Sequence, residues 1–276
     1  MDFILLGKAL ILGIVEGLTE FLPVSSSGHL ILVPALFGWD DQGLAFDVGL
    51  HVGTLAALLA YFWRDWVVMA RSAVADLADG RITAAKWSEP TRLLLLIALG
   101  SVPTAVVGLA FATTIEENLR QPWLVAILLA AAGGIMLVAD RRAAQQRTIR
   151  NVGRADALII GLAQACALFP GVSRSGATMT AALFRQFARA DAARFAFLLG
   201  TPAFVGAALL ASLDLRDESS PDLVELGVGF ACSALVGFVV IRWLLRFLRT
   251  RTLLPFVAYR LVLATITLTV AAARVV

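Results

Sequence analysis

Residues 13–32 read GIVEGLTEFLPVSSSGHLIL. The segment is apolar enough to enter a membrane, yet it contains two glutamates, three consecutive serines and one of the two histidines of the chain. A charged side chain at the centre of a membrane helix costs roughly 2.5–3.5 kcal/mol on insertion scales. Polar residues kept at such a cost indicate a functional site rather than a simple anchor.

The composition is that of a membrane protein. Of the 276 residues, 59% are hydrophobic and 16% are charged, and the mean hydropathy is +0.85. A soluble domain carries about 25% charged residues, so we predict an all-α polytopic membrane protein and exclude a soluble enzyme. The first residues lack the basic region and cleavage site of a removable signal peptide. Cys166 and Cys232 are expected to be small buried side chains rather than a disulfide.

Six segments are predicted to cross the bilayer, each near the roughly 20 residues that a span needs: about 44–63, 93–112, 123–139, 193–213, 224–242 and 253–273. Four connections hold 17 of the 23 basic residues, and these are 64–92, 141–154, 185–194 and 242–251. The intervening connections are acidic, with Asp40, Asp41, Glu116, Glu117, Asp214, Asp217, Glu218 and Asp222. The positive-inside rule places the basic connections in the cytoplasm and both termini outside.

Two more apolar segments, about 3–38 and 156–190, do not fit as spans. Gly, Pro and Ser interrupt each of them, and each must return to the side it entered if the charges of the connections are to alternate. We therefore predict two re-entrant helix–loop–helix hairpins. Irregular backbone at that depth is tolerated only where protein or water surrounds it, so both loops are expected inside the bundle.

The two hairpins resemble each other in sequence. Residues 13–30 align without gaps on residues 161–178, GLAQACALFPGVSRSGAT. Identical pairs are Gly13/Gly161, Phe21/Phe169, Val24/Val172, Ser25/Ser173, Ser27/Ser175 and Gly28/Gly176. The alignment predicts a tandem duplication within one membrane domain, 1–276, made of repeat one (1–140), a cytoplasmic connector (141–155) and repeat two (156–276). Because each repeat holds an odd number of spans, the second is inverted, and the two loops can meet near the midplane.

Glu16 and Glu20 lie four residues apart, on one face of a helix that is expected to end near Pro23. Two like charges at this spacing repel each other, so they require a cation or a shared proton. Oxygen ligands on one face suit Mg²⁺ or Ca²⁺, which bridge carboxylates and substrate phosphates. We predict that Glu16 and Glu20 bind a divalent cation; pairing with an arginine or with backbone groups is the alternative.

The segment SSSGH, residues 25–29, has the composition of an anion site. Serines at the start of a helix are ordinary N-caps, but hydroxyls and free amides together at a helix N-terminus bind anions. Gly28 permits a close approach of the backbone. Ser25, Ser27 and Gly28 are therefore candidate substrate-binding residues, and Ser26 and His29 are candidate catalytic residues.

The second loop, PGVSRSGAT at 170–178, supplies a cation. Arg174 offers a fork of donors that matches phosphate oxygens. The candidate substrate-binding residues around it are Ser173, Ser175, Gly176 and Thr178. A structural salt bridge from Arg174 to Glu16 or Glu20 is the alternative, and it too would join the loops. Carboxylates, serine, histidine and arginine around an anion site indicate phosphoryl transfer on a lipid-linked substrate.

At these residues the sequence resembles the bacitracin-resistance family of undecaprenyl pyrophosphate phosphatases. EGLTE (16–20) fits the family motif (E/Q)xxxE, VSSSGH (24–29) fits its serine–histidine loop, and PGVSRSGAT (170–178) fits PGxSRSxxT. The resemblance implies a multi-pass enzyme of the bacterial inner membrane that removes the terminal phosphate of undecaprenyl pyrophosphate with a divalent cation. That reaction recycles the lipid carrier of peptidoglycan synthesis and is linked to bacitracin resistance. The functional residues that the resemblance implies are Glu16, Glu20, Ser26, His29, Ser173, Arg174 and Thr178.

Three schemes for attack on phosphorus stay open: Ser26 with His29 as a base oriented by Glu20, direct attack by His29, and attack by metal-activated water. The first is preferred because Ser26 lies three residues before His29, which brings them close if a helix starts there. The rival function is transport, since an inverted repeat with broken helices could flip a lipid phosphate. A homodimer and roles for His51 and Arg260 are also open, and no nucleic-acid partner is expected.

The charge pattern makes a topology prediction. If the connections that hold 17 of the 23 basic residues are cytoplasmic, both termini are outside. A C-terminal reporter that is active only in the cytoplasm should therefore stay silent, while the same reporter inserted in the connector 141–155 should be active. A strong signal from the C-terminal fusion would contradict this topology and with it the inverted repeat.

Overall fold

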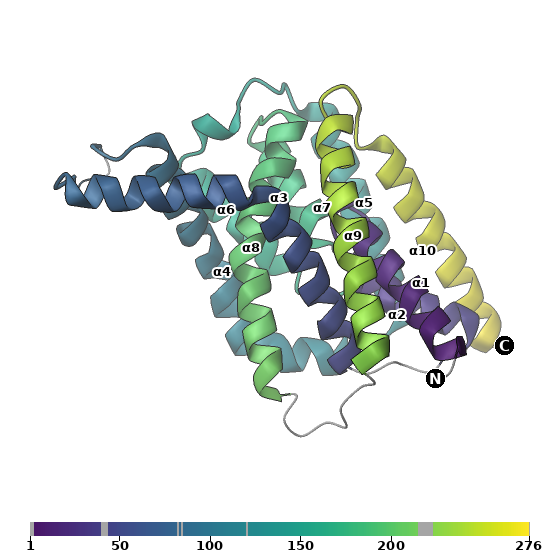
Figure 1. Cartoon of the computed structure of the whole chain (residues 1–276). Helices are drawn as coiled ribbons and strands as arrows, with labels where there is room; N and C mark the ends of the chain where they lie inside the picture. Colours follow the sequence, from purple (N-terminus) through teal and green to yellow (C-terminus); the bar gives the residue numbers. More distant parts are fainter. Residues whose placement is uncertain are drawn as a thin grey trace.

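The computed structural model of the protein describes residues 3–39, 44–81, 83, 85–119, 121–214 and 223–275. Within these residues the regular secondary structure is helical. The helices are α1 (Phe3–Thr19), α2 (Ser26–Phe37), α3 (Leu44–Ala78), α4 (Glu89–Asn118), α5 (Pro122–Arg142), the 3₁₀ turn η1 (Ile149–Asn151), α6 (Arg154–Cys166), α7 (Arg174–Phe184), α8 (Arg189–Asp214), α9 (Leu223–Phe247) and α10 (Leu254–Val275). Most of them lie side by side in one bundle (Figure 1).

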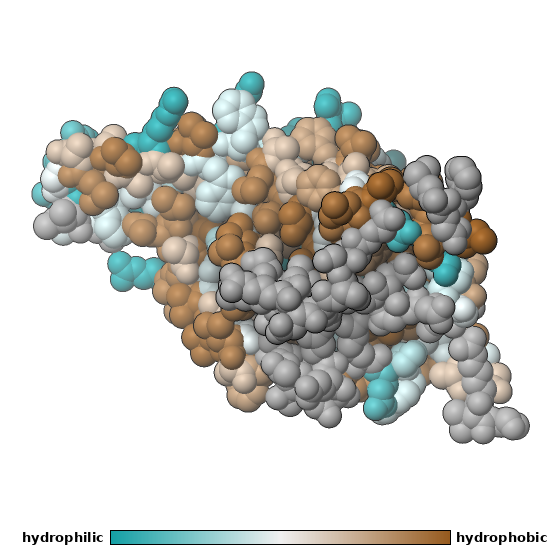
Figure 2. Space-filling model, turned by 60° about the horizontal axis from the view of Figure 1, so that its bottom comes forward, coloured by the Kyte–Doolittle hydropathy of each residue, from teal (hydrophilic) through white to brown (hydrophobic). Residues whose placement is uncertain are grey.

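Six helices of the described chain are long and apolar enough to cross a membrane: α3, α4, α5, α8, α9 and α10. They correspond one for one to the six predicted spans, which confirms an all-α polytopic membrane protein. Their outward sides are apolar, with Leu109 and Leu235 73% and 70% exposed, and hydrophobic residues cover much of the flank in Figure 2. Such a large exposed apolar surface is typical of contact with lipid chains.

The chain begins and ends at the same end of the bundle, where α1 starts and α10 finishes (Figure 1). This placement agrees with two termini on one side of a membrane. The placement of both termini on the outer side of the membrane stays a prediction. Some residues of the predicted acidic connections lie outside the described residues, and these are Asp40, Asp41, Asp217, Glu218 and Asp222.

One predicted connection is partly helical. The sequence predicts that the first span ends near residue 63 and that a connection, 64–92, follows. A kink at Phe62 agrees with this end of the span, but the chain beyond it stays helical to Ala78. The backbone of Phe62 is non-helical (φ −99°, ψ 15°), and beyond this kink the helix points away from the bundle (Figure 1). In this extension charged residues are interspersed with apolar ones, and Val68, Val74 and Leu77 are exposed whereas Asp76 is buried. Because charged residues recur along it, a search for continuous apolar segments does not find it.

The two segments predicted as re-entrant hairpins are helix pairs, α1 with α2 and α6 with α7. We call their connecting loops tip one (residues 20–25) and tip two (residues 167–173). The hairpins touch beside the tips, where the Ser175 hydroxyl donates to the Leu22 carbonyl oxygen at 3.0 Å. Each loop therefore ends inside the protein, against the other hairpin, as irregular backbone within a membrane requires.

Each hairpin packs against a long helix of the other predicted repeat. Helix α1 lies along α9, and α6 lies along α4. A Cβ atom on Gly13 would lie 2.7 Å from the carbonyl oxygen of Gly229 in α9, and one on Gly161 would lie 2.0 Å from that of Gly100 in α4. Only glycine permits so close an approach of two helices. The two glycines are equivalent in the predicted duplication, and their packing is equivalent too; the inversion of the repeats across a membrane stays a prediction.

The tips also share a local conformation. Ser25 and Ser173 both adopt a positive φ, 77° and 74°, which is uncommon for residues other than glycine. The side chain of each accepts a hydrogen bond from the N–H of the glycine three residues later, Gly28 or Gly176. These serines are therefore N-caps, and they start α2 and α7 at the next residue.

A buried carboxylate fixes the basic end of the bundle. Asp156, in the first turn of α6, is 2% exposed, and its oxygens accept hydrogen bonds from Arg147 at 2.5 Å and from Arg185 at 2.6 Å. Burial opposes ionisation of this carboxyl, but the two guanidinium groups and the Gly153 N–H outweigh it and lower the pKa to about 2. The predicted connector 141–155 is thereby tied to the second hairpin.

Asp156→Asn should therefore destabilise the fold. The amide keeps the shape but cannot neutralise Arg147 and Arg185, so the free energy of unfolding in detergent micelles should fall by about 1–3 kcal/mol. Because the folded pKa lies below the ordinary value of 3.8, this contribution is present above about pH 4 and is lost as the pH falls toward about 2. The control is Glu89→Gln, since Glu89 lies 4.0 Å from Arg150 on the surface and its loss should cost less than about 1 kcal/mol. Equal losses in the free energy of unfolding for Asp156→Asn and Glu89→Gln would contradict this role of Asp156.

Candidate active site

Glu20 connects the two hairpins. Its Oε2 accepts a hydrogen bond from the Ser26 hydroxyl, and its Oε1 accepts one from the Arg174 guanidinium. Glu20 lies just after α1, which ends at Thr19 rather than near Pro23, while Ser26 and Arg174 are the first residues of α2 and α7. Glu20 and Ser26 are both buried. The fold therefore brings a hydroxyl, its acceptor and a cation together from two distant parts of the chain.

Arg174 is held on two sides. Besides its ion pair with Glu20, its Cζ atom lies 3.3 Å from the ring centroid of Phe204 in α8. An aromatic face and a carboxylate together fix the plane of the guanidinium. Since the Arg174 side chain is 22% exposed, part of its donor fork stays available to an anion. The salt bridge that the sequence analysis kept as an alternative is present, and it is compatible with phosphate binding.

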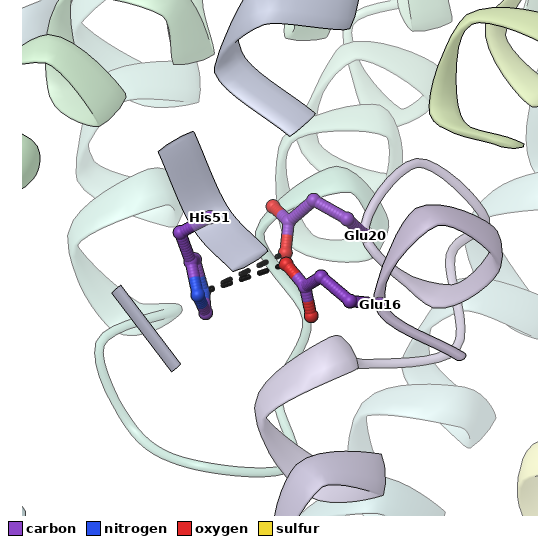
Figure 3. A group of neighbouring side chains, drawn as sticks. All are labelled: Glu16, Glu20 and His51. Atoms are coloured by element: carbon purple, nitrogen blue, oxygen red, sulfur yellow. Dashed lines mark ion pairs between the residues drawn. The ribbon is translucent and has the colours of Figure 1, made fainter. Parts of the chain in front are cut away.

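Glu16, Glu20 and His51 form a cluster (Figure 3). The Nε2 atom of His51 lies 3.7 Å from Glu16 Oε1 and 4.0 Å from Glu20 Oε2. The Nδ1 of the same ring donates to the Asp47 carbonyl oxygen at 2.8 Å, so Nε2 is the ring nitrogen that faces the two carboxylates. Glu16 is fully buried, and neither of its carboxylate oxygens has a hydrogen-bond partner among the described residues.

This cluster is suited to a positive ion. A buried carboxylate without a hydrogen-bond partner is strongly unfavourable, and here a second carboxylate, that of Glu20, lies beside it. The three ligand atoms lie within 4.8 Å of one another, and carboxylate and imidazole are common ligands of divalent cations. The cation predicted at Glu16 and Glu20 stays a prediction, and His51 joins them as a candidate ligand.

His29 does not pair with Ser26 as the sequence analysis predicts. Its Nδ1 donates to the Ser25 carbonyl oxygen at 2.7 Å, and its Nε2 accepts from the Tyr259 hydroxyl of α10 at 2.6 Å. Both ring nitrogens are therefore occupied, and the acceptor of the Ser26 hydroxyl is Glu20. The three-residue spacing of Ser26 and His29 does not bring their side chains into contact, because the Tyr259 hydroxyl of another helix orients the His29 ring.

The other predicted site residues shape the tips, and they are Ser25, Ser27, Gly28, Ser173, Ser175, Gly176 and Thr178. The Ser25 and Ser27 hydroxyls are 3.3 Å apart, and the equivalent hydroxyls beside tip two are 3.2 Å apart. Thr178 is fully buried and donates to carbonyl oxygens of its own helix at 2.7 and 3.2 Å. These contacts hold the tips in place, and contact of these residues with substrate stays a prediction.

The quoted motifs do not contain three residues that the fold adds to the site. His51 reaches the carboxylates from α3, Phe204 stacks on Arg174 from α8, and Tyr259 binds the histidine of α2 from α10. Of the three, only His51 carries a signal in the sequence, as a rare polar residue inside an apolar span. Phe204 and Tyr259 carry none, because aromatic residues are common in membrane helices.

Comparison with known proteins shows the family of this chain. The family model described as bacitracin resistance protein BacA matches residues 9–266. The chain is 44% identical over 268 residues to the undecaprenyl-diphosphatase of Pelotomaculum thermopropionicum, which covers 97% of both chains. It is 46% identical over 256 residues to the undecaprenyl-diphosphatase of Geobacter sulfurreducens, covering 92% of this chain and 93% of the relative. It is 44% identical over 272 residues to undecaprenyl-diphosphatase 2 of Stutzerimonas stutzeri, covering 97% and 98%. The resemblance seen in the motifs is confirmed, and the chain belongs to the bacitracin resistance protein BacA family.

Proposed function

We propose that this protein is an undecaprenyl-diphosphatase, which hydrolyses undecaprenyl pyrophosphate to undecaprenyl phosphate and inorganic phosphate within the membrane. The family and the activity named for its relatives support this proposal. The observation that carries it for this chain is the double contact of Glu20 with Ser26 and Arg174. A hydroxyl on a carboxylate and a phosphate-binding cation share one buried site. In the cell the reaction would return the carrier lipid to cell-wall synthesis.

The pyrophosphate would bind where both hairpins present donors. Arg174 offers a planar fork suited to phosphate oxygens. Helices α2 and α7 begin at Ser26 and Arg174, so the free N–H groups and positive dipole ends of both helices are at the site. Because these donors come from two hairpins, only the assembled fold would bind the anion. The isoprenyl chain would remain in the bilayer, along the apolar flank seen in Figure 2.

Ser26 and Glu20 are the nucleophile and base of this proposal. Glu20 takes the hydroxyl proton while the Ser26 oxygen forms a bond to the terminal phosphorus. The bond from that phosphorus to the bridging oxygen breaks, and Glu20 passes the proton to the departing undecaprenyl phosphate. Water then attacks the phosphoserine, and Glu20 takes a proton from the water and returns it to Ser26 as inorganic phosphate leaves. Arg174 stabilises the charge that develops on the phosphoryl oxygens.

Of the two other schemes, attack by His29 is weaker on this geometry. Direct attack by His29 would require a free ring nitrogen, but both nitrogens have partners. Attack by water without a phosphoserine remains the alternative to Ser26, because Glu20 could equally accept a proton from water.

A divalent cation is part of the proposal. Glu16, Glu20 and His51 would hold it, because neither Glu16 oxygen has a hydrogen-bond partner among the described residues and the His51 Nε2 atom faces both carboxylates. When bound, the ion would offset the negative charge of the pyrophosphate and of the transition state. Mg²⁺ and Ca²⁺ suit the carboxylates, and the imidazole also admits transition-metal ions.

We place the protein in the bacterial inner membrane, with the site open to the periplasm. His51 lies near the start of α3, and its 37% exposed side chain is the most accessible of the three candidate ligands. Tip one enters from the end of the bundle where the chain begins (Figure 1), and the positive-inside rule puts that end outside. Spent carrier pyrophosphate would be met on that side.

Transport of a lipid phosphate is the second candidate function, since two broken helix pairs meet inside the bundle. A flippase needs an anion site but has no use for a serine hydroxyl held on a carboxylate. The contact between Ser26 and Glu20 therefore favours hydrolysis.

Purified protein in detergent should release inorganic phosphate from undecaprenyl pyrophosphate. A micelle has no second leaflet, so transport cannot account for this signal. Ser26→Ala should lower kcat at least about 1000-fold, because it removes the attacking oxygen. The matched control is Ser101→Ala in α4, where the hydroxyl only donates to the Ile97 carbonyl oxygen and activity should stay within about twofold. Normal turnover by Ser26→Ala would point to water as the nucleophile, and transfer across vesicles without phosphate release would favour transport.

Glu16→Gln should weaken the cation site. The neutral amide removes a charge that faces only His51 and Glu20, so the cation concentration for half-maximal activity should rise about tenfold or more. The increase in thermal stability that the cation gives to the protein should shrink in parallel, which is a readout without turnover. Glu89→Gln, at an exposed carboxylate outside the site, should change neither the cation concentration for half-maximal activity nor the stabilisation by the cation. A lower kcat with unchanged cation dependence would instead make Glu16 a proton acceptor.

A further inference from the structure

Arg260, in the second turn of α10, is fully buried. Among the described residues its side chain donates four hydrogen bonds, all to backbone carbonyl oxygens: Nε to Leu129 at 3.0 Å, Nη1 to Pro23 at 3.2 Å, and Nη2 to Gly171 and Val172 at 3.0 Å each. Pro23 belongs to tip one, Gly171 and Val172 belong to tip two, and Leu129 belongs to α5. One side chain therefore binds both tips and a long helix.

Packing alone does not explain an arginine at this position. Its four partners are neutral carbonyl groups, and a buried guanidinium without a carboxylate carries a large desolvation penalty. An apolar side chain of similar volume would fill the space without that penalty. What distinguishes arginine is its rigid fork of five N–H donors. The fold at this point requires donors that reach three backbone segments at once.

The surrounding chain is shaped to the guanidinium. A Cβ atom on Gly133 of α5 would lie 3.5 Å from Arg260 Nε, and one on Gly176 of α7 would lie 2.9 Å from Nη1. The second distance is shorter than side-chain carbon atoms tolerate, so the guanidinium takes space that only glycine leaves free. Gly176 is also the residue whose N–H bonds the Ser173 cap. Arg260 is thus built into the start of the helix that carries Arg174.

We propose that Arg260 is a positioning residue that holds the two tips in register, so that Ser26 and Glu20 face Arg174. The inference rests on the proposed hydrolysis. Pro23 lies between Glu20 and Ser26 in the chain, and tip two ends at the residue before Arg174, so a shift of either set of carbonyl groups displaces the reacting groups. A displacement of about 1 Å can lower a rate about 100-fold. Arg260 itself bonds none of the three reacting side chains.

Arg260→Lys and Arg260→Met test the proposal by phosphate release from purified protein. Lysine keeps the charge but cannot reach all four carbonyl oxygens, so kcat should fall about 10-fold with lysine and about 100-fold with methionine, while KM changes less than about threefold. Arg189 provides matched controls, because its partly buried guanidinium bonds Asp140 at 2.5 Å and bonds no residue of either tip among the described residues. The same two substitutions there should leave kcat per folded molecule within about twofold.

A double-mutant cycle separates positioning from a loss of folded protein. Arg174→Lys alone should lower kcat about 100-fold, since an ammonium cannot replace the fork. If Arg260 acts by aligning Arg174, the variant that combines Arg174→Lys with Arg260→Met should lie within about threefold of Arg174→Lys alone. If the two losses multiply to about 10,000-fold, Arg260 acts independently of Arg174 and the proposal is overturned.

A readout without turnover keeps the inference separate from the proposed hydrolysis. Leu22→Cys and Ser175→Cys, in a protein that lacks Cys166 and Cys232, place thiols on two residues that contact each other across the hairpins. A short bifunctional thiol reagent should link them, and Arg260→Met should slow the linking about fivefold or more, because the tips lose their shared anchor. Unchanged linking overturns the positioning role whatever the kcat. Slowed linking supports positioning, and an absence of phosphate release from the protein with native Leu22 and Ser175 would overturn only the hydrolysis.

Discussion

Backbone that leaves a helix inside a membrane must find hydrogen-bond partners within the protein, because each unsatisfied group costs several kcal/mol in lipid. Both hairpins of this protein break in this way, and the surrounding residues supply the partners. Ser25 and Ser173 accept N–H groups at the two helix starts, Ser175 donates to a carbonyl group of the opposite hairpin, and Arg260 donates to carbonyl groups of both tips. The groups that satisfy the broken backbone also create the polar surroundings in which an anion can bind.

The ion pair between Glu20 and Arg174 contributes more to the alignment of the two hairpins than to the stability of the fold. Desolvation of two buried charges offsets most of their attraction, so the pair adds little to the free energy of unfolding. It does fix one hairpin against the other, because Glu20 holds Arg174 with one oxygen and Ser26 with the other. In surroundings of low polarity, donors that are already oriented act strongly on the charge of a transition state.

Neither hairpin contains a complete site. The first carries two carboxylates and a hydroxyl but no arginine at its tip, and the second carries Arg174 but has Gln164 where the first has Glu16. The Gln164 amide is buried and donates to the Thr104 hydroxyl at 3.1 Å, so it lies in a neutral contact between α6 and α4. Two loops with the same cap geometry thus carry different chemistry. The candidate site exists only where they face each other.

The sequence by itself determined the six long apolar helices, the two interrupted hairpins and the serine caps, because lipid excludes unpaired backbone and a cap needs only its own neighbours. It also predicted that Glu20 and Arg174 could meet. Tertiary structure alone decided which groups face each other: Glu20 rather than His29 accepts the Ser26 hydroxyl, and His51 joins the carboxylates from another helix. Spacing along a helix specifies the face on which a side chain lies, but the partner on that face is chosen by how distant helices pack.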